Sequence, residues 1–135
     1  MRGRALGLDF GHKRVGVAIS DELWIAAHAL TVLPRREAPA RVAELVGEYG
    51  VSEIVIGLPT TLSGQEGRSA LAARQFGGEI EEATGLAITW VDERFTSKDA
   101  ERVMLEAGAR RRVRRTNLDK VAAAVILQSF LDRPR

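Results

Sequence analysis

The sequence predicts an α/β fold with a mixed five-stranded sheet, its first three strands antiparallel, and helices on both faces. Two apolar, β-rich runs open the chain, at 5–10 and 15–19, and the short polar stretch between them contains glycine, as in an antiparallel hairpin. Segments with helical periodicity then alternate with short apolar runs, which is the order of right-handed strand–helix–strand crossovers. The length of 135 residues favours a single domain over 1–135.

The same patterns place the remaining elements. A third strand is expected over 25–33, because Pro34 ends that apolar run. A helix is expected over 35–50, where apolar residues recur at helical spacing up to a final glycine. The consecutive apolar residues within 51–57 are typical of a strand buried on both faces. Further along the chain, the pattern predicts a helix over 68–84, a strand over 86–91, a helix from Thr96 or Ser97 to Gly108, and a helix over 118–131 capped by Asn117.

Composition excludes several classes of protein. Hydrophobic residues make up 45% of the chain and charged residues 28%, which is ordinary for a globular protein. No apolar run approaches the roughly 18 residues of a membrane span, and the N-terminus has no signal-peptide pattern. Cysteine is absent, so neither a disulfide framework nor a thiolate zinc site can form. We therefore expect a cytoplasmic protein without a membrane partner, in which oxygen or histidine would hold any metal.

Arginine dominates the basic residues, accounting for 17 of 20 although the net charge is only +2. Its planar guanidinium suits bidentate recognition of phosphate. The densest run lies in 109–116 and contains Arg110, Arg111, Arg112, Arg114 and Arg115. Such a run should repel itself and stay mobile until an anion binds. With Lys13, Arg14 and Arg94, it would hold a polyanion; the alternatives are a solvated surface and arginine-rich codon usage.

Carboxylates stand at the ends of predicted strands and helices. Asp9 ends the first strand, and Asp92 and Glu93 follow the last. Because side chains alternate across a strand, only one of that pair can face the side of Asp9. Asp119 is expected in the first turn of the final helix. If the first, fourth and fifth strands are parallel neighbours, three of these acids converge on one edge of the sheet.

Three converging carboxylates repel one another unless a cation neutralises them. An all-oxygen cluster suits Mg²⁺ or Mn²⁺. Two such ions about 4 Å apart can activate water and stabilise the leaving oxygen in phosphodiester cleavage. Each acid also has a simpler interpretation. Asp119 could complement the helix dipole, Asp92 and Glu93 could end a strand in solvent, and Asp9 could be an ordinary turn residue.

Four ordered blocks together resemble the YqgF/RuvX family, whose members are described as pre-16S rRNA nucleases or Holliday-junction-resolvase-like proteins. The blocks are Leu8–Gly11 with Lys13–Asp21, Val55–Pro59 with Gly64, Asp92–Ser97, and Asp119–Ala123 with Ile126–Gln128. The resemblance covers nearly the whole chain and implies an RNase H-like three-layer fold with a divalent-metal nuclease site. By position, Asp9, Glu93 and Asp119 take the catalytic and metal-binding roles.

The sequence departs from the family pattern at His12, Phe95 and Ser97, none of which is one of the acids. A fourth acid common in related resolvases has no clear counterpart near Asp119, so one metal ion is better supported than two. The expected activity is endonucleolytic cleavage of structured RNA or branched DNA by a monomer or homodimer.

Within that activity, processing of the 5′ end of pre-16S rRNA is favoured over junction cleavage, which normally needs a two-fold dimer. A non-catalytic nucleic-acid-binding module is the alternative from another class, but it predicts an incomplete set of acids. The first hairpin also resembles the phosphate-binding hairpin of actin-like ATPases, which close two such domains around ATP.

Overall fold

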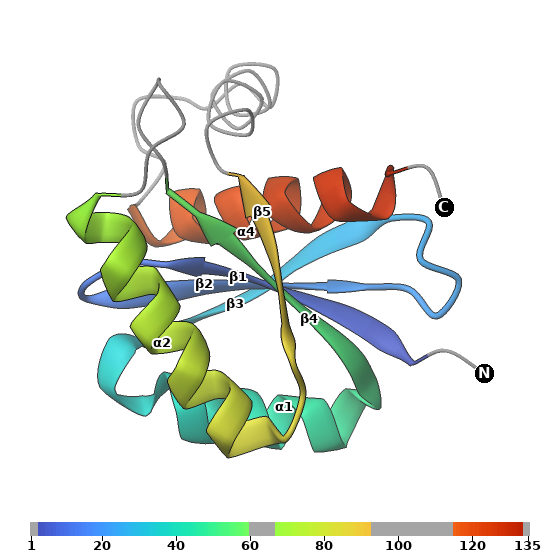
Figure 1. The fold of residues 1–135 in the computed structure, drawn as a ribbon. Helices are drawn as coiled ribbons and strands as arrows, with labels where there is room; N and C mark the ends of the chain where they lie inside the picture. The colour runs from blue at the N-terminus through green and yellow to red at the C-terminus, as the bar shows by residue number, and fades with distance from the viewer. Residues whose placement is uncertain (1–2, 60–66, 93–114, 134–135) are drawn as a thin grey trace.

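The structure is a computed structural model that describes residues 3–59, 67–92 and 115–133 (Figure 1). Its elements are β1 (Arg4–Phe10), β2 (Arg14–Ser20), β3 (Ala27–Pro34), the 3₁₀ turn η1 (Arg35–Glu37), α1 (Ala38–Tyr49), β4 (Val51–Leu58), α2 (Arg68–Thr84), β5 (Ile88–Asp92) and α4 (Arg115–Leu131). The helix expected up to Gly108 and the arginines from 110 to 114 lie outside the described residues.

The five strands form one sheet in the order β3-β2-β1-β4-β5. β1 pairs antiparallel with β2, and β2 pairs antiparallel with β3. β1 pairs parallel with β4, and β4 pairs parallel with β5. The predicted mixed sheet is therefore confirmed. Its three parallel strands end at one edge, here called the carboxyl edge, which is the condition for the predicted acids to converge.

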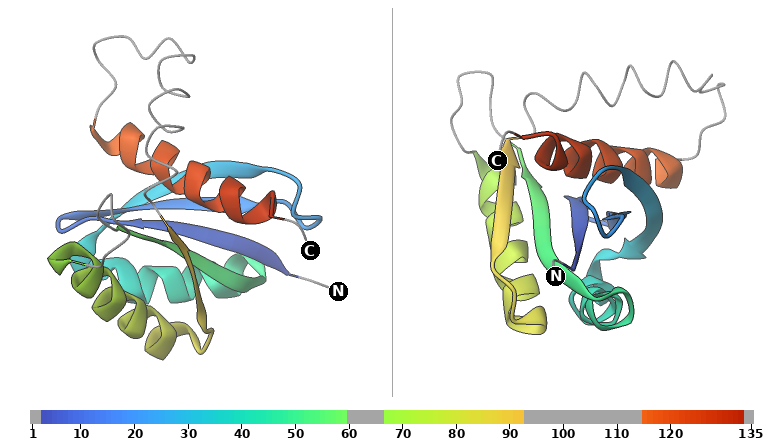
Figure 2. Two further views of the ribbon diagram at one scale, coloured as in Figure 1. Left: turned by 45° about the horizontal axis from the view of Figure 1, so that its top comes forward. Right: turned by 90° about the vertical axis from the view of Figure 1, so that its right-hand side faces the viewer.

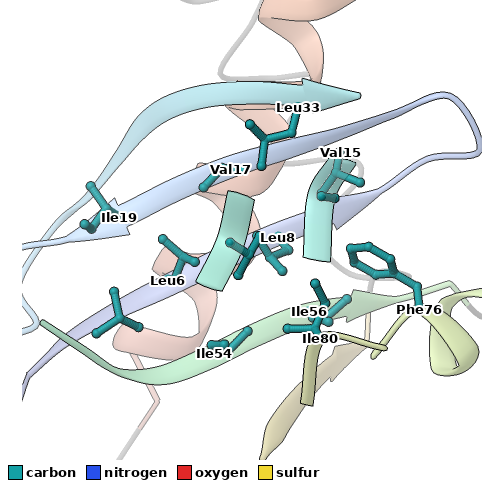
Figure 3. Packing of buried hydrophobic residues seen from close by; sticks show 13 residues of the cluster. Leu6, Leu8, Val15, Val17, Ile19, Leu33, Ile54, Ile56, Phe76 and Ile80 are labelled. Atoms are coloured by element: carbon teal, nitrogen blue, oxygen red, sulfur yellow. The ribbon is translucent and has the colours of Figure 1, made fainter. Parts of the chain in front are cut away.

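Helices cover both faces of the sheet, as predicted: α4 lies on one face, and α1 and α2 lie on the other (Figure 2). The period-2 alternation of the strands decides which side chains meet which helix. In β1, Leu6 and Leu8 belong to the large core together with Phe76 and Ile80 of α2 (Figure 3). Ala5, which precedes Leu6 and has the opposite phase, packs with α4. Even-numbered residues of β1 therefore face α1 and α2, and odd-numbered residues face α4.

The layer between the sheet and α4 is built from small residues. Ala5 and Ala18 pack against Ala123 and Leu127, all of them buried. A Cβ on Gly7 would lie 2.7 Å from the Cβ of Leu127, closer than real Cβ atoms approach. Small side chains on both partners thus let α4 lie close against the sheet.

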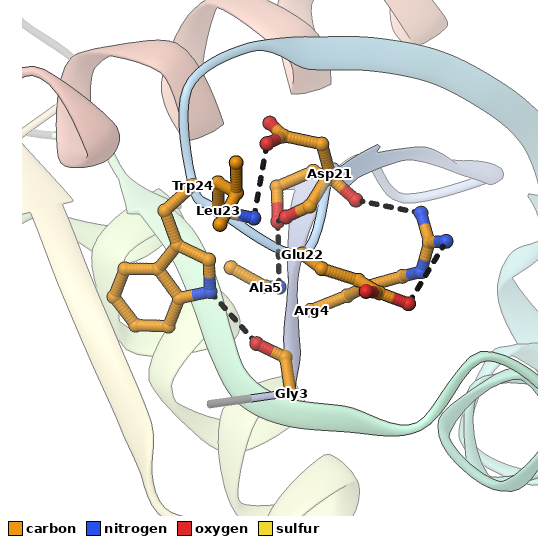
Figure 4. Close-up of polar contacts among 8 residues, drawn as sticks. Gly3, Arg4, Ala5, Asp21, Glu22, Leu23 and Trp24 are labelled. Atoms are coloured by element: carbon orange, nitrogen blue, oxygen red, sulfur yellow. Dashed lines mark hydrogen bonds and ion pairs between the residues drawn. The ribbon is translucent and has the colours of Figure 1, made fainter. Parts of the chain in front are cut away.

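The third strand begins at Ala27, two residues later than predicted, because the carboxylate of Asp21 captures the preceding backbone; Figure 4 shows its contact with Leu23. Asp21 accepts hydrogen bonds from the N–H of Leu23 at 3.0 Å and from those of Ile25 and Ala26 at 2.8 Å each. These N–H groups are consequently unavailable to the ladder of the sheet.

The same turn holds Trp24 at φ 60°, in the left-handed region that bulky residues rarely adopt. Its indole Nε1 donates to the carbonyl of Gly3 at 2.8 Å, and its ring lies 5.4 Å from that of Phe130. On the α4 side, Gln128 accepts from the N–H of Ala27 at 2.8 Å and donates to the carbonyl of Ile25 at 3.1 Å. The turn over 21–26 is therefore tied to both the N-terminal strand and the final helix.

Two other boundaries differ from the prediction for local reasons. Residues 35–37 form a 3₁₀ turn, not part of the helix, because Pro39 has no N–H to donate back to Arg35. β5 begins at Ile88 and not at Leu86. The N–H of Leu86 donates to the hydroxyl of Thr84, and the N–H of Ile88 donates to the carboxylate of Glu81. These bonds hold the residues after α2 in a turn, so the strand begins only at Ile88.

The final helix begins at Arg115, three residues before the predicted Leu118. Asn117 thus lies inside the helix and is not its cap. Asp119 was predicted to lie in the first turn of the helix, but it lies beyond that turn. Because the helix dipole acts mainly within the first turn, the simple electrostatic interpretation of Asp119 loses its basis.

Within residues 3–59, 67–92 and 115–133, no helix has the length and hydropathy to cross a membrane.

Candidate active site at the carboxyl edge

Asp9 lies at the end of β1 on the α4 side of the sheet. It is an odd-numbered residue of β1, in phase with Ala5 and Gly7, which contact α4. Its cross-strand partner in β2 is Gly16. Directly paired residues of neighbouring strands project to the same face, so the side chain of Asp9 shares its face with the position of Gly16.

Asp119 lies above this same position. A Cβ on Gly16 would clash with the backbone carbonyl of Asp119 and would lie 3.2 Å from the Asp119 Cβ. Only glycine allows α4 to come this close to β2. The register of the hairpin and the close approach at Gly16 therefore bring Asp9 and Asp119, 110 positions apart in sequence, to one place on the α4 face.

Arg14 meets the carboxylate of Asp119. Its Nε donates to Oδ2 over 3.2 Å, and both side chains are about one-third exposed, at 33% and 27%. A partly shielded ion pair holds its geometry better than a fully exposed one, because solvent screens it less. Arg14 was predicted to bind phosphate; the structure places its guanidinium beside a predicted metal ligand.

The β1–β2 turn forms the wall of an open hollow of about 410 Å³ next to this pair. Gly11, His12, Lys13, Arg14 and Asp119 line it. Gly11 is required by a tight turn, since a Cβ there would lie 2.6 Å from the carbonyl oxygen of Arg14. The exposed Lys13 and the half-buried Arg14 give the hollow cationic groups beside a carboxylate.

Arg35, which the sequence analysis did not select, fixes this turn to the rest of the fold. Its N–H donates to the carbonyl of Lys13 at 2.9 Å, and its guanidinium pairs with Glu79 at 2.8 Å. The same guanidinium lies 5.4 Å from the ring of Phe10 and 4.8 Å from that of Phe76. The turn that carries Lys13 is thereby anchored to α2 through the opposite face of the sheet.

The alternation of β5 separates the two acids that end it. Val91 packs with the α4 cluster, whereas Asp92 is paired with Leu58, which packs against Ala70 and Ala73 of α2. Asp92 therefore projects to the face opposite Asp9 and Asp119.

The predicted site residues divide into two groups. Asp9, Asp119, Lys13 and Arg14 come together at the carboxyl edge. Glu93, Arg94, Arg110, Arg111, Arg112 and Arg114 lie outside the described residues, and Arg115 is the first residue of α4. In the part of the chain that the structure describes, no three acidic or histidine side chains group as metal ligands. Gly16, like Arg35, is a residue of the site that the sequence analysis did not select, although its β-strand position between valines was a visible signal.

The relatives of this chain identify its family. A profile described as "RuvX: Holliday junction resolvase" matches residues 3–133. A protein of Moorella thermoacetica named "Putative pre-16S rRNA nuclease" is 47% identical over 133 residues, covering 96% of this chain and 95% of the relative. The chain belongs to the RuvX family. A second relative with the same name, from Agathobacter rectalis, is 42% identical over 135 residues, and the match covers 96% of this chain and 94% of the relative. As a member of this family, the protein is a hydrolytic nuclease.

Solved structures share the fold of this RuvX-family protein. "T. thermophilus RuvC in complex with Holliday junction substrate" superposes with a TM-score of 0.62 at 14% identity and covers 93% of this chain and 92% of its own. The fowlpox virus Holliday junction resolvase gives a TM-score of 0.54 at 12% identity and covers 96% of this chain and 98% of its own. At these identities the likeness establishes the fold, and the RNase H-like three-layer prediction is confirmed.

Proposed function

We propose that this protein is a divalent-metal-dependent endonuclease that processes the 5′ end of precursor 16S rRNA. One observation carries the proposal: Asp9 and Asp119 share one place on the α4 face, across a glycine that admits the backbone of α4. The names of the curated relatives, which cover nearly the full chain, support the choice of substrate.

The donor chemistry of the site fits Mg²⁺ or Mn²⁺. Asp9 and Asp119 offer carboxylate oxygens, the ligands these ions prefer, and the chain has no cysteine. Glu93 is the third proposed ligand, because the family resemblance gives this role to Glu93 and because the neighbouring Asp92 lies on the opposite face of the sheet. A bound ion supplies Lewis-acid charge that lowers the pKa of water and neutralises negative charge on the phosphate.

The remaining residues of the site would bind and orient the substrate. Lys13 is exposed at the tip of the turn, in a hollow open enough to admit a phosphate group. Arg14 holds Asp119 by one carboxylate oxygen, Oδ2, so the other oxygen would be the one to bind a metal ion. Arg94 and the arginines Arg110, Arg111, Arg112, Arg114 and Arg115 are proposed to bind the flanking polyanion.

The deciding experiment is cleavage of two substrates by the same preparation. Precursor 16S rRNA and a four-way DNA junction are incubated with the protein and Mn²⁺ or Mg²⁺, and the ends of the products are mapped. We expect trimming at the 5′ side of the rRNA. Paired symmetric cuts in the junction would instead assign the protein to junction resolution, the activity in the description of its family.

Four single variants test the assignment of the acids. Asp9→Asn, Glu93→Gln and Asp119→Asn should each lose cleavage while retaining RNA binding, because each removes one ligand but preserves shape. Asp92→Asn is the matched control and should keep activity, since Asp92 lies on the α2 face. Loss of cleavage in Asp92→Asn with retention in Glu93→Gln would reverse the assignment. Tight RNA binding without cleavage by the wild-type protein would contradict the nuclease function.

A further inference from the structure

Three exposed side chains form a ridge along the first half of α2. Arg68, Leu71 and Arg74 are spaced three residues apart, so they follow one another along one side of the helix. All three are exposed, and Leu71 retains 66% of its accessible surface. Within the described residues, Arg68 has no ion-pair partner. We call Arg68, Leu71 and Arg74 the α2 ridge.

The charged side chains of α2 are distributed in the opposite way to that favoured by the helix dipole. The first eleven residues include two arginines and no acid, whereas the last six include Glu79, Glu81 and Glu82 and no base. The positive N-terminal end of a helix favours acids, and the negative C-terminal end favours bases. Glu79 and Glu81 already have partners within the fold, Arg35 and the N–H of Ile88. Arg68 has no ion-pair partner among the described residues, and its position is unfavourable for the helix, which indicates that the basic half serves a partner with negative charge.

The basic half of α2 lies at the carboxyl edge of the sheet. The start of α2 is at the same end of the molecule as the β1–β2 turn and the start of α4, in both Figure 1 and Figure 2. Arg74 is held there: its guanidinium lies 5.2 Å from the ring of Trp90, near the end of β5. Gly77 makes this packing possible, since a Cβ there would lie 2.6 Å from the Trp90 ring.

The ridge and the β1–β2 turn lie at opposite sides of the carboxyl edge, and the ridge belongs to the α2 layer, on the face of the sheet opposite Asp9 and Asp119. Lys13 lies on the β2 side of Asp9, and the ridge lies on the β5 side. A strand that crosses the acids and continues around the end of β5 would reach the ridge on the other face of the sheet. Guanidinium groups recognise phosphate oxygens, and an exposed leucine between them can contact the apolar faces of sugars.

We propose that the α2 ridge binds the sugar–phosphate backbone of the nucleic-acid substrate on the β5 side of the cleavage site. This inference rests on the proposed function and adds a second contact surface to it, separate from the β1–β2 turn and from the arginine run. Recognition of backbone phosphates fixes the register of the substrate without reading its sequence.

The test compares two double variants in the Asp9→Asn protein, which prevents cleavage during measurement. One carries Arg68→Gln and Arg74→Gln. The control carries Arg41→Gln and Arg133→Gln, which remove the same charge from α1 and from the residues just after α4; Arg133 also stacks on an aromatic ring, at 5.9 Å from Phe130. Affinity for a hairpin RNA containing the 5′ precursor sequence is measured over a range of salt concentrations.

The ridge variant should bind about tenfold more weakly at 0.1 M salt, and its salt slope should be smaller by about 1.5 because two phosphate contacts are lost. The control should retain the slope of its parent. Equal slopes in the two double variants would overturn the inference. Failure of the proposed function is distinguishable, since the Asp9→Asn parent would then not bind this RNA, or wild type would bind it without cleavage.

A second variant separates a binding role from a structural one. Arg68→Glu should raise the melting temperature by about 1–4 °C, because it restores a favourable charge at the N-terminal end of α2, and it should weaken RNA binding. A lower melting temperature would show that Arg68 stabilises the fold and would overturn the argument from charge reversal. Retained affinity would overturn the inference directly.

Discussion

At the scale of single residues, glycine decides where the acids stand. Gly7 and Gly16 both face α4, one near the middle of the helix and the other under Asp119. Each admits the helix to a distance that any Cβ would prevent. The separation of Asp119 from Asp9 is therefore set by the absence of a side chain in β2.

The first prediction concerns Gly16→Ala, which retains every proposed ligand. The new methyl group meets the backbone of Asp119, so α4 must shift and carry this carboxylate away from Asp9. We expect stability to fall by about 1–3 kcal/mol, as for other overpacked sites. Cleavage should fall by about a hundredfold or more, because catalysis is sensitive to displacements of about 1 Å. Urea unfolding and single-turnover kinetics measure the two effects.

Gly7→Ala is the matched control for this variant. It presses on the same helix at Leu127, two turns further along, where no proposed ligand lies. It should lose comparable stability but keep more of its activity at a temperature where both variants are folded. Equal losses of activity in both variants would mean that the overall packing of α4 against the sheet, and not the position of Asp119, governs catalysis.

The sequence predicted which residues belong to the site more successfully than it predicted which residues contact one another. The sequence indicated Asp9, Asp119, Lys13 and Arg14, and the structure brings these four together. It did not indicate that Arg14 pairs with Asp119, because the two are 105 positions apart and the pairing depends on where α4 begins. A glycine in a strand likewise does not reveal which backbone lies opposite it.

At the scale of elements, α2 contains two adjacent glycines in opposite surroundings. Gly77 faces the Trp90 ring, whereas a Cβ on Gly78 would meet nothing within 4 Å. Gly78→Ala should stabilise the protein by about 0.5–1 kcal/mol by lowering the entropy of the unfolded helix segment. Gly77→Ala should destabilise it by about 1–3 kcal/mol by displacing Trp90. Thermal unfolding of the two variants measures this, and effects of the same sign would contradict the packing described.

The turn over 21–26 makes stability depend on pH. The N–H of Ala26 is the main cause that lowers the pKa of Asp21 below its ordinary value of 3.8; those of Ile25 and Leu23 add to it, and partial desolvation opposes them. A folded-state pKa below the unfolded one stabilises the protein above the unfolded pKa, and this contribution is lost as pH falls through the folded pKa. Asp21→Asn should therefore be less stable than wild type at pH 7, and the difference should shrink below about pH 4.

Urea unfolding at pH 7, 5 and 3 measures this dependence. Glu22→Gln serves as the control, since Glu22 is exposed and its contact with Arg4 is 3.7 Å long. A difference between wild type and Asp21→Asn that stays constant over this range would show that charge on Asp21 does not hold the turn.

The predicted element boundaries were wrong where side chains compete for backbone N–H groups. Asp21 delays β3, and Thr84 and Glu81 delay β5. Hydrophobic runs predict that a strand exists but do not show which of its first N–H groups are already bonded. The order of elements, by contrast, follows from periodicity, and the sequence predicted it through β5.

At the scale of the whole molecule, the mixed sheet creates the site by bringing three parallel strand ends to one edge. This topology was predictable because hairpins force antiparallel pairing and helical crossovers force parallel pairing. The face on which each acid stands was predictable only in part. The resemblance implied Glu93 over Asp92, and the pairing of Asp92 with Leu58 gives the physical reason to exclude Asp92.

The final prediction links metal to global stability. If carboxylates at the carboxyl edge hold Mn²⁺, its addition at a hundred times the dissociation constant should raise the free energy of unfolding by about 2.7 kcal/mol. Asp9→Asn and Asp119→Asn should lose most of this gain, and Asp92→Asn should keep it. Thermal unfolding with and without EDTA provides the measurement. A gain of equal size in all four proteins would place the ion elsewhere.

The start of β1 and the end of α4 both lie at the side of the sheet away from the carboxyl edge (Figure 1). The directions of the two elements explain this, since β1 runs toward Asp9 from its far end and α4 runs back from Asp119 along the sheet. A protein attached to a bead or sensor surface through either terminus would consequently present its candidate site outward. Immobilised preparations should therefore engage long RNA as freely as the protein in solution.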